Sequence, residues 1–125
     1  FIDFADGEAT MLLPFAEHLV GNPETGVLHG GAITSLLDAT CGAAVFMKLQ
    51  SPEPIATLDL RIDYLKRGEP RREVRCKAQC YKVTRHVAFV RGSAYHDDES
   101  DPIAAAAGSF IIQGRGPAIV GRSTP

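Results

Sequence analysis

The longest apolar segment of the 125-residue chain runs from Gly30 to Leu49. Its many Ala and Leu residues, without the alternation of a strand, predict a helix. Pro52 and Pro54 cannot continue a helix, so we expect it to end before them. Asp38 lies in the middle of this segment with no basic residue near it in the sequence. In a membrane span a central Asp would cost roughly 2.5–3.5 kcal/mol, which favours a buried helix of a soluble domain.

Four segments after the prolines predict strands, because apolar and polar residues alternate or β-branched residues are frequent. These segments are residues 55–65, 73–83, 86–96 and 103–112. In the first of them, alternation predicts that one face carries Ala56, Leu58, Leu60, Ile62 and Tyr64, and the other face Thr57, Asp59, Arg61 and Asp63. Before the helix, residues 6–15 predict a short strand and residues 18–27 a loop rich in turn-forming residues.

The order of these elements predicts an α+β domain. Consecutive strands with short turns pair antiparallel, and one long helix would lie on one face of their sheet. The chain has room for one core, so we expect a single domain over residues 1–125. The helix is apolar nearly all round, and one sheet face cannot cover all of it. We therefore expect a second subunit to cover the remainder.

Composition and net charge argue against a nucleic-acid or membrane partner. The chain is 45% hydrophobic and 22% charged, with a net charge of −2 at pH 7. The charge is uneven, since residues 61–91 hold ten Lys and Arg against three acids, a local +7 that leaves −9 elsewhere. Such a basic zone could bind a small anion. Lys and Arg also protect sheet edges, and the sequence does not separate these two explanations.

The cysteines bear on redox state and metals. Cys41, Cys76 and Cys80 are an odd number in a chain with a normal core, which favours reduced thiols and a cytoplasmic location. No second Cys or His pair has the spacing of a zinc site, so we expect no metal. We see no signal-peptide pattern. The sequence starts at Phe1 rather than Met, so we expect further residues to precede it.

The helical positions of His29 and Asp38 exclude a pair within one chain. They are nine residues apart. At about 100° and 1.5 Å per residue they lie half a turn out of phase and roughly 14 Å apart. If both serve one site, they must come from two helices lying side by side and antiparallel, as in a twofold dimer.

The residue types at these positions suggest acyl transfer. Gly30 and Gly31 would expose backbone N–H groups at the helix start, where the helix dipole favours negative charge. Such donors can polarise a carbonyl oxygen, and a carboxylate opposite could act as nucleophile or general base. Two plainer explanations stay open: the glycines form only a tight turn, or Asp38 accepts a structural hydrogen bond from Thr34 or a nearby loop.

Four stretches carry a family resemblance: NPETGVLHGGAITSLLDATCG, ATLDLRIDYLKRG, TRHVAFVRGSAYHDD and IAAAAGSFII. With HGG, an acid nine residues after the His, and then a T-L-D-x-x-x-x-Y strand from Thr57 to Tyr64, the chain resembles the hotdog-fold acyl-CoA thioesterases of the PaaI-like group over about residues 8–113. The resemblance implies a long central helix wrapped by an antiparallel sheet of about five strands. It also implies a homodimer with a continuous sheet, often paired again into a dimer of dimers. The family hydrolyses coenzyme A thioesters without metal, and coenzyme A is part of the substrate rather than a cofactor.

Carried over position by position, the resemblance gives each candidate residue a role. Asp38 would be the general base or nucleophile, and the Gly30 N–H would polarise the thioester carbonyl. His29 would begin that turn, and Thr57 would position water or Asp38.

The chain departs from the family pattern at two places. Family members usually carry Asn or Gln six residues before the His, where this chain has Pro23, and Asn22 lies one position further away. The turn before residues 88–90 commonly contains Gly-Lys or Gly-Arg and here has Thr84 and Arg85. The candidates for binding the phosphates of coenzyme A are Lys66, Arg67, Arg85 and His86.

The sequence therefore favours an acyl-CoA thioesterase. One alternative is a hydratase or dehydratase of acyl thioesters on the same fold. The other is a non-catalytic protein that binds acyl-CoA, because a fold does not fix a function.

Overall fold

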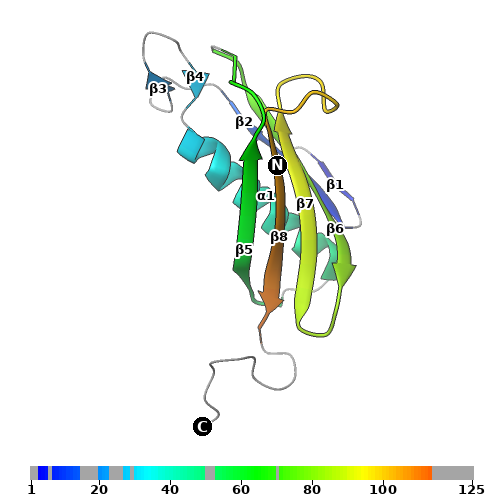
Figure 1. The fold of residues 1–125 in the computed structure, drawn as a ribbon. Coiled ribbons are helices and arrows are strands. Elements are labelled where there is room, and N and C mark those ends of the chain that lie inside the picture. Colours follow the sequence, from blue (N-terminus) through cyan, green and yellow to red (C-terminus); the bar gives the residue numbers. More distant parts are fainter. Residues whose placement is uncertain are drawn as a thin grey trace.

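The computed structural model describes residues 3–5, 7–14, 20–22, 27–28, 30–49, 53–69 and 71–113. These residues form one long helix and an antiparallel sheet that curves around it (Figure 1). The helix is α1 (Gly30–Leu49), and it has the bounds predicted from the sequence. By length and composition alone this helix could span a membrane. Here it packs on the sheet and supplies much of the core.

The described part of the main sheet holds six strands in the order β1-β2-β6-β7-β8-β5. Their bounds are β1 (Asp3–Ala5), β2 (Glu8–Leu13), β5 (Ile55–Tyr64), β6 (Val74–Val83), β7 (Val87–Tyr95) and β8 (Ala104–Ile112). Helix α1 follows β2 and precedes β5, and these two strands lie toward opposite edges of the sheet. The helix is therefore the segment of the chain that crosses the inner face of the sheet from one side to the other. This arrangement confirms the predicted hotdog fold, with β1 as a short additional strand.

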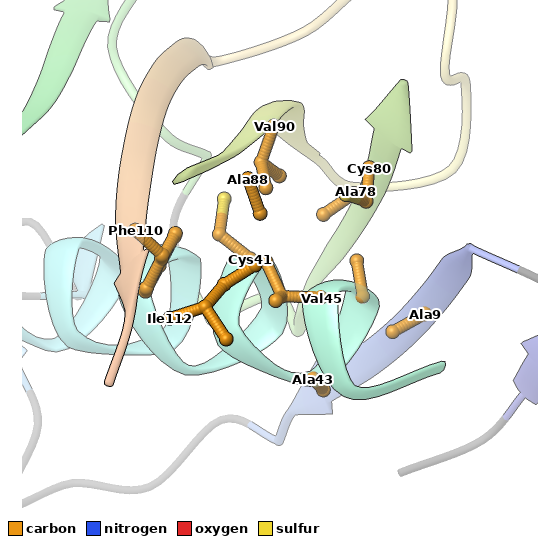
Figure 2. Close-up of a cluster of buried hydrophobic side chains, with 11 residues drawn as sticks. Ala9, Cys41, Ala43, Val45, Ala78, Cys80, Ala88, Val90, Phe110 and Ile112 are labelled. Atoms are coloured by element: carbon orange, nitrogen blue, oxygen red, sulfur yellow. The ribbon is translucent and has the colours of Figure 1, made fainter. Parts of the chain in front are cut away.

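The core lies between α1 and the inner face of the sheet (Figure 2). Cys41 and Val45 of the helix share one buried cluster with Ala78, Val90 and Phe110 of three neighbouring strands. A second buried cluster, nearer the helix start, includes Ile33, Leu37, Val74 and Ile103. Alanines at many inner positions of the sheet leave room for the helix to approach closely, as dense packing requires.

Two predictions about connectivity are wrong. β5 pairs with β8 and not with β6, its neighbour in sequence, because β6 is already flanked by β2 and β7. Residues 18–27 are not wholly a loop, since β3 (Val20–Asn22) pairs antiparallel with β4 (Val27–Leu28). The β-branched Val20 and Val27 favour extended backbone on both sides of the turn formers. This small hairpin lies at the start of α1 (Figure 1).

A β-bulge in β5 shifts the phase of its side chains. The pairing with β8 skips Leu58, because Thr57 and Asp59 take consecutive partners on that strand. Leu58 is 52% exposed, although alternation predicted it on the core face. Thr57, predicted on the opposite face, points toward the helix. From Leu60 onward the predicted alternation holds, so the prediction is wrong only before the bulge.

Gly108 of β8 makes room for β5 beside the bulge. It lies opposite Leu60 in the β5–β8 pair. A Cβ atom added at Gly108 would lie 2.8 Å from the carbonyl oxygen of Asp59 and 2.9 Å from Cδ1 of Leu60. Because one of these atoms belongs to the backbone, a side chain at position 108 would displace β5.

We expect Gly108→Ala to lower the free energy of unfolding by about 1–3 kcal/mol, the usual effect of overpacking. The matched control is Ala107→Ser on the exposed face of the same strand, which should stay within about 0.5 kcal/mol of wild type. Urea unfolding at one fixed protein concentration measures both. A Gly108→Ala protein as stable as the control would contradict the steric argument.

Candidate active site

Asp38 and Thr57 meet where β5 passes the third turn of α1. The Thr57 hydroxyl donates a hydrogen bond to Oδ1 of Asp38 over 3.2 Å. Asp38 is partly buried and Thr57 is exposed. The contact exists because the bulge at Leu58 turns Thr57 toward the helix. The structure therefore brings together two of the residues predicted for the site, through a feature that alternation alone did not predict.

The start of α1 is held by Tyr64, which the sequence analysis did not single out for the site. The Tyr64 hydroxyl donates a hydrogen bond to the carbonyl oxygen of Gly30 over 2.9 Å. It also lies 2.6 Å from Oγ1 of Thr34. Gly30 itself is exposed. The available signal was a tyrosine at the end of the predicted inner face of a strand, where a polar tip needs a partner.

Gly30 and Asp38 lie on the same continuous helix but far apart. They are eight positions apart in the sequence. At 1.5 Å and 100° per residue they are about 12 Å apart along the axis and roughly 80° apart around it. The dipole at the helix start and the Asp38 carboxylate therefore cannot act on the same atom within one chain. Of the structural partners considered for Asp38, Thr34 instead lies against the Tyr64 hydroxyl, and the hydrogen bond to Asp38 comes from Thr57.

The remaining candidates near the helix start are only partly described. Asn22 is the last residue of β3, and its backbone pairs with Val27 on β4. The side chain of Asn22 and the whole of His29 lie outside the described residues.

The four candidate phosphate-binding residues form two pairs at opposite ends of the sheet. Lys66 and Arg67 directly follow the end of β5. Arg85 and His86 lie in the turn between β6 and β7, and the His86 carbonyl accepts a hydrogen bond from the Ile112 N–H over 2.7 Å. Ile112 pairs with the first residue of β5. Since β5 has ten residues, the two pairs lie about 30 Å apart in one chain.

Ion pairs explain much of the basic zone. The acidic turn at residues 97–101 lies against it: Lys66 contacts Asp101 over 2.6 Å, Lys77 contacts Glu99 over 3.4 Å, and Arg72 contacts Asp97. Such solvent-exposed pairs contribute little to stability, but they occupy the cations. In the segments that the structure describes, Arg67 and Arg85 form no ion pair. These two arginines are thus the better candidates for an external anion.

Cys41, almost one turn beyond Asp38, is a poor alternative nucleophile. Burial, and after it the negative charge of Asp38, raise the pKa of the Cys41 thiol to about 12. Burial, and then the nearby Cys41, raise the pKa of Cys76 to about 12 as well. Only a thiolate attacks readily. In the described segments, no three His, Cys, Asp or Glu side chains are grouped as a metal site.

We expect Cys41 and Cys76 of the folded protein to resist iodoacetamide at pH 8, because a pKa of about 12 leaves only about 10⁻⁴ of each thiol ionised there. Mass spectrometry of labelled peptides measures the modification. The same peptides from protein unfolded in urea are the control, and should be labelled fully. Rapid labelling of Cys41 in the folded protein would contradict the raised pKa.

Comparisons with known proteins agree on one superfamily. The sequence profile of the thioesterase superfamily matches residues 25–103. The medium/long-chain acyl-CoA thioesterase YigI of Escherichia coli is 31% identical over 107 residues, covering 75% of this chain and 68% of YigI. A crystal structure of a Pseudomonas aeruginosa protein is 48% identical with a TM-score of 0.78, covering 85% of this chain and 78% of that one. A variant of the phenylacetic acid degradation protein PaaI from Thermus thermophilus shares the fold, with 24% identity, a TM-score of 0.72 and coverage of 88% and 89%. Gly30, Asp38 and Thr57 lie within the range of this chain that the profile matches.

Proposed function

The chain belongs to the thioesterase superfamily and is a thioester hydrolase of the hotdog fold, and we propose that its substrates are acyl-CoA thioesters, which it hydrolyses to a free acid and coenzyme A. The hydrogen bond from Thr57 to Asp38 is the observation that carries the proposal. It orients a partly buried carboxylate that would attack the thioester carbonyl carbon or take a proton from the attacking water. A relative named as an acyl-CoA thioesterase supports coenzyme A as the carrier.

The proposed site needs two copies of the chain. β5 is an edge strand of the described sheet, and Leu58, Tyr64 and Leu65 beside that edge are exposed. A second copy that adds its own β5 antiparallel to this edge would extend the sheet. If the twofold axis lies near Leu60 and Arg61, Tyr64 of one copy lies opposite Thr57 of the other.

This twofold arrangement would join the two separated halves of the site. Tyr64 holds Gly30, and Thr57 holds Asp38, within each chain. The start of one helix would then face the Asp38 carboxylate of the second copy. The exposed side of α1, which includes Gly31, Ser35, Ala39 and Phe46, would lie against the second helix. Small residues there allow a close approach of the two helices.

The same twofold rotation would also bring together the residues proposed to bind the phosphates of coenzyme A. Lys66 and Arg67 of one copy would lie at the same end of the joined sheet as Arg85 and His86 of the other. The two pairs, about 30 Å apart in one chain, would then flank one substrate. Arginine suits this task because its planar guanidinium binds phosphate with two donors.

In the proposed reaction the thioester oxygen accepts a hydrogen bond from the Gly30 N–H, where the helix dipole stabilises the developing negative charge. Asp38 of the other copy either takes a proton from the water that forms the new C–O bond, or forms that bond itself in an anhydride that water then hydrolyses. The C–S bond breaks and the departing sulfur takes up a proton, so the products are the free acid and coenzyme A. His29 and Asn22 would shape the turn before Gly30, as the family resemblance implies.

We propose that no metal or cofactor takes part in the reaction and that the dimer pairs again into a tetramer. We also propose that the protein is cytoplasmic, as its free buried cysteines favour.

We expect Asp38→Asn to lower kcat by at least ~10²-fold with fold and dimer intact, because the amide neither attacks the carbonyl nor takes a proton. Release of free thiol from short, medium, long and aryl acyl-CoAs measures the activity. Near-wild-type turnover would remove Asp38 from the mechanism. A wild-type protein that binds acyl-CoA at micromolar concentration without hydrolysis, or hydrates an enoyl-CoA, would favour one of the two alternative functions instead.

Subunit mixing tests the shared site directly. Gly30→Pro removes the proposed donor, since proline lacks an N–H, and proline is well tolerated at the first position of a helix. We expect each of Gly30→Pro and Asp38→Asn to be nearly inactive alone. In a hybrid dimer one of the two sites keeps both wild-type groups, so unfolding and refolding an equal mixture should restore about one quarter of wild-type activity. No recovery in hybrid dimers, or an active monomer in sedimentation, would contradict the two-chain site.

A further inference from the structure

We propose that Tyr64 is a positioning residue for this reaction, because its hydroxyl binds the Gly30 carbonyl and so restrains the residue whose N–H is proposed to polarise the thioester carbonyl. The inference rests on the proposed function and adds a residue to its machinery. Three atoms carry it: the Tyr64 hydroxyl oxygen, the Gly30 carbonyl oxygen at 2.9 Å and Oγ1 of Thr34 at 2.6 Å.

The direction of these hydrogen bonds follows from the number of protons. A carbonyl oxygen can only accept, so the single phenolic proton of Tyr64 lies toward Gly30. The Thr34 hydroxyl must then donate to the Tyr64 oxygen. The three groups form a chain from Thr34 through Tyr64 to Gly30, in which each hydrogen bond polarises the next.

The start of α1 needs such an anchor because it consists of two glycines. Gly30 and Gly31 leave the backbone accessible to a ligand, but each glycine costs a helix roughly 0.5–1 kcal/mol relative to alanine through lost backbone entropy. At a helix start only the N–H groups lack helical partners, so the Tyr64 hydroxyl does not fill a missing hydrogen bond but adds one to the Gly30 carbonyl. A donor held by β5 restrains the peptide group between Gly30 and Gly31, and through it the Gly30 backbone, without placing a side chain where the substrate would approach.

Burial in the core of its own chain does not explain the tyrosine at this position. The side chain is 51% exposed, so its ring contributes little to the core. Hydrogen bonds to neighbouring backbone nevertheless fix the position of Tyr64. It pairs with Ala104 on β8, and the next N–H, of Leu65, donates to the Ile103 carbonyl over 2.7 Å. The strand therefore presents the hydroxyl from a fixed position, as a positioning role requires.

The first test measures whether the Tyr64→Phe substitution changes kcat, KM or both. We expect Tyr64→Phe to lower kcat by about three- to tenfold, the equivalent of one hydrogen bond, with KM for acyl-CoA within about twofold of wild type. The oxygen gains negative charge only in the transition state, so the loss should fall on kcat. The control is Tyr81→Phe, which removes the hydroxyl of an exposed tyrosine whose ring stacks on Arg91, and it should leave both constants unchanged. Unchanged kcat in Tyr64→Phe would overturn the proposal.

A second test does not depend on activity. In protein labelled with ¹⁵N-glycine, we expect order parameters near 0.85 for Gly30 and Gly31 in wild type and below about 0.6 in Tyr64→Phe. Unchanged order parameters would overturn the role of Tyr64 even in an active enzyme. A wild-type protein without thioesterase activity would instead remove the proposed function, so the two failures are distinguishable.

The Thr34 hydroxyl supplies a third test of the same chain of hydrogen bonds. Thr34→Val removes the donor to Tyr64 and should lower kcat by less than Tyr64→Phe, because the bond to Gly30 remains. Thr34→Ser keeps the hydroxyl and should restore kcat. A Thr34→Ser enzyme as slow as Thr34→Val would contradict the chain of hydrogen bonds, since the slow turnover would then not depend on the hydroxyl.

Discussion

The candidate site depends on the pairing of β5 with β8. This pairing fixes two side chains of β5 against two points of α1: Tyr64 at Gly30 and Thr57 at Asp38. Both contacts require β5 to keep its phase relative to the helix. The bulge at Leu58 gives Thr57 its direction, and the missing side chain at Gly108 lets β5 lie close enough for the bulge to form. A packing constraint in the sheet thus sets the geometry of a carboxylate on the helix.

The helix can meet these contacts because it lies close to the sheet. Gly92 of β7 illustrates the closeness, since a Cβ atom there would come within 3.4 Å of the Cys41 sulfur and 3.1 Å of the Lys77 carbonyl oxygen. The same burial that packs Cys41 raises its pKa and makes it unreactive. Asp38, almost one turn earlier, stays at the boundary of the core. The helix therefore places an inert thiol inside the core and a partly buried carboxylate at its boundary.

Most of the fold followed from hydrophobic patterning. The helix bounds, the four long strands and the antiparallel α+β arrangement are determined by local sequence, because apolar runs and alternation act over a few residues. Strand order was not predictable in this way. β5 pairs with β8 because β6 already has two partners, and that choice depends on the whole sheet. The short hairpin of β3 and β4 was hidden by the turn-forming residues between its strands.

The sequence by itself determined the helix, the position of Asp38 on it and, through helical phase, the conclusion that the helix start and Asp38 must come from two chains to serve one site. It also identified the superfamily, through HGG and the acid that follows. Only the tertiary structure decided that Thr57 faces Asp38, that Tyr64 holds Gly30, and that acids of a distant turn pair with Lys66, Arg72 and Lys77 of the basic zone. The physical reason is that strand phase after a bulge and the pairing of distant charges depend on neighbours from other strands, whereas helical phase depends only on residue number.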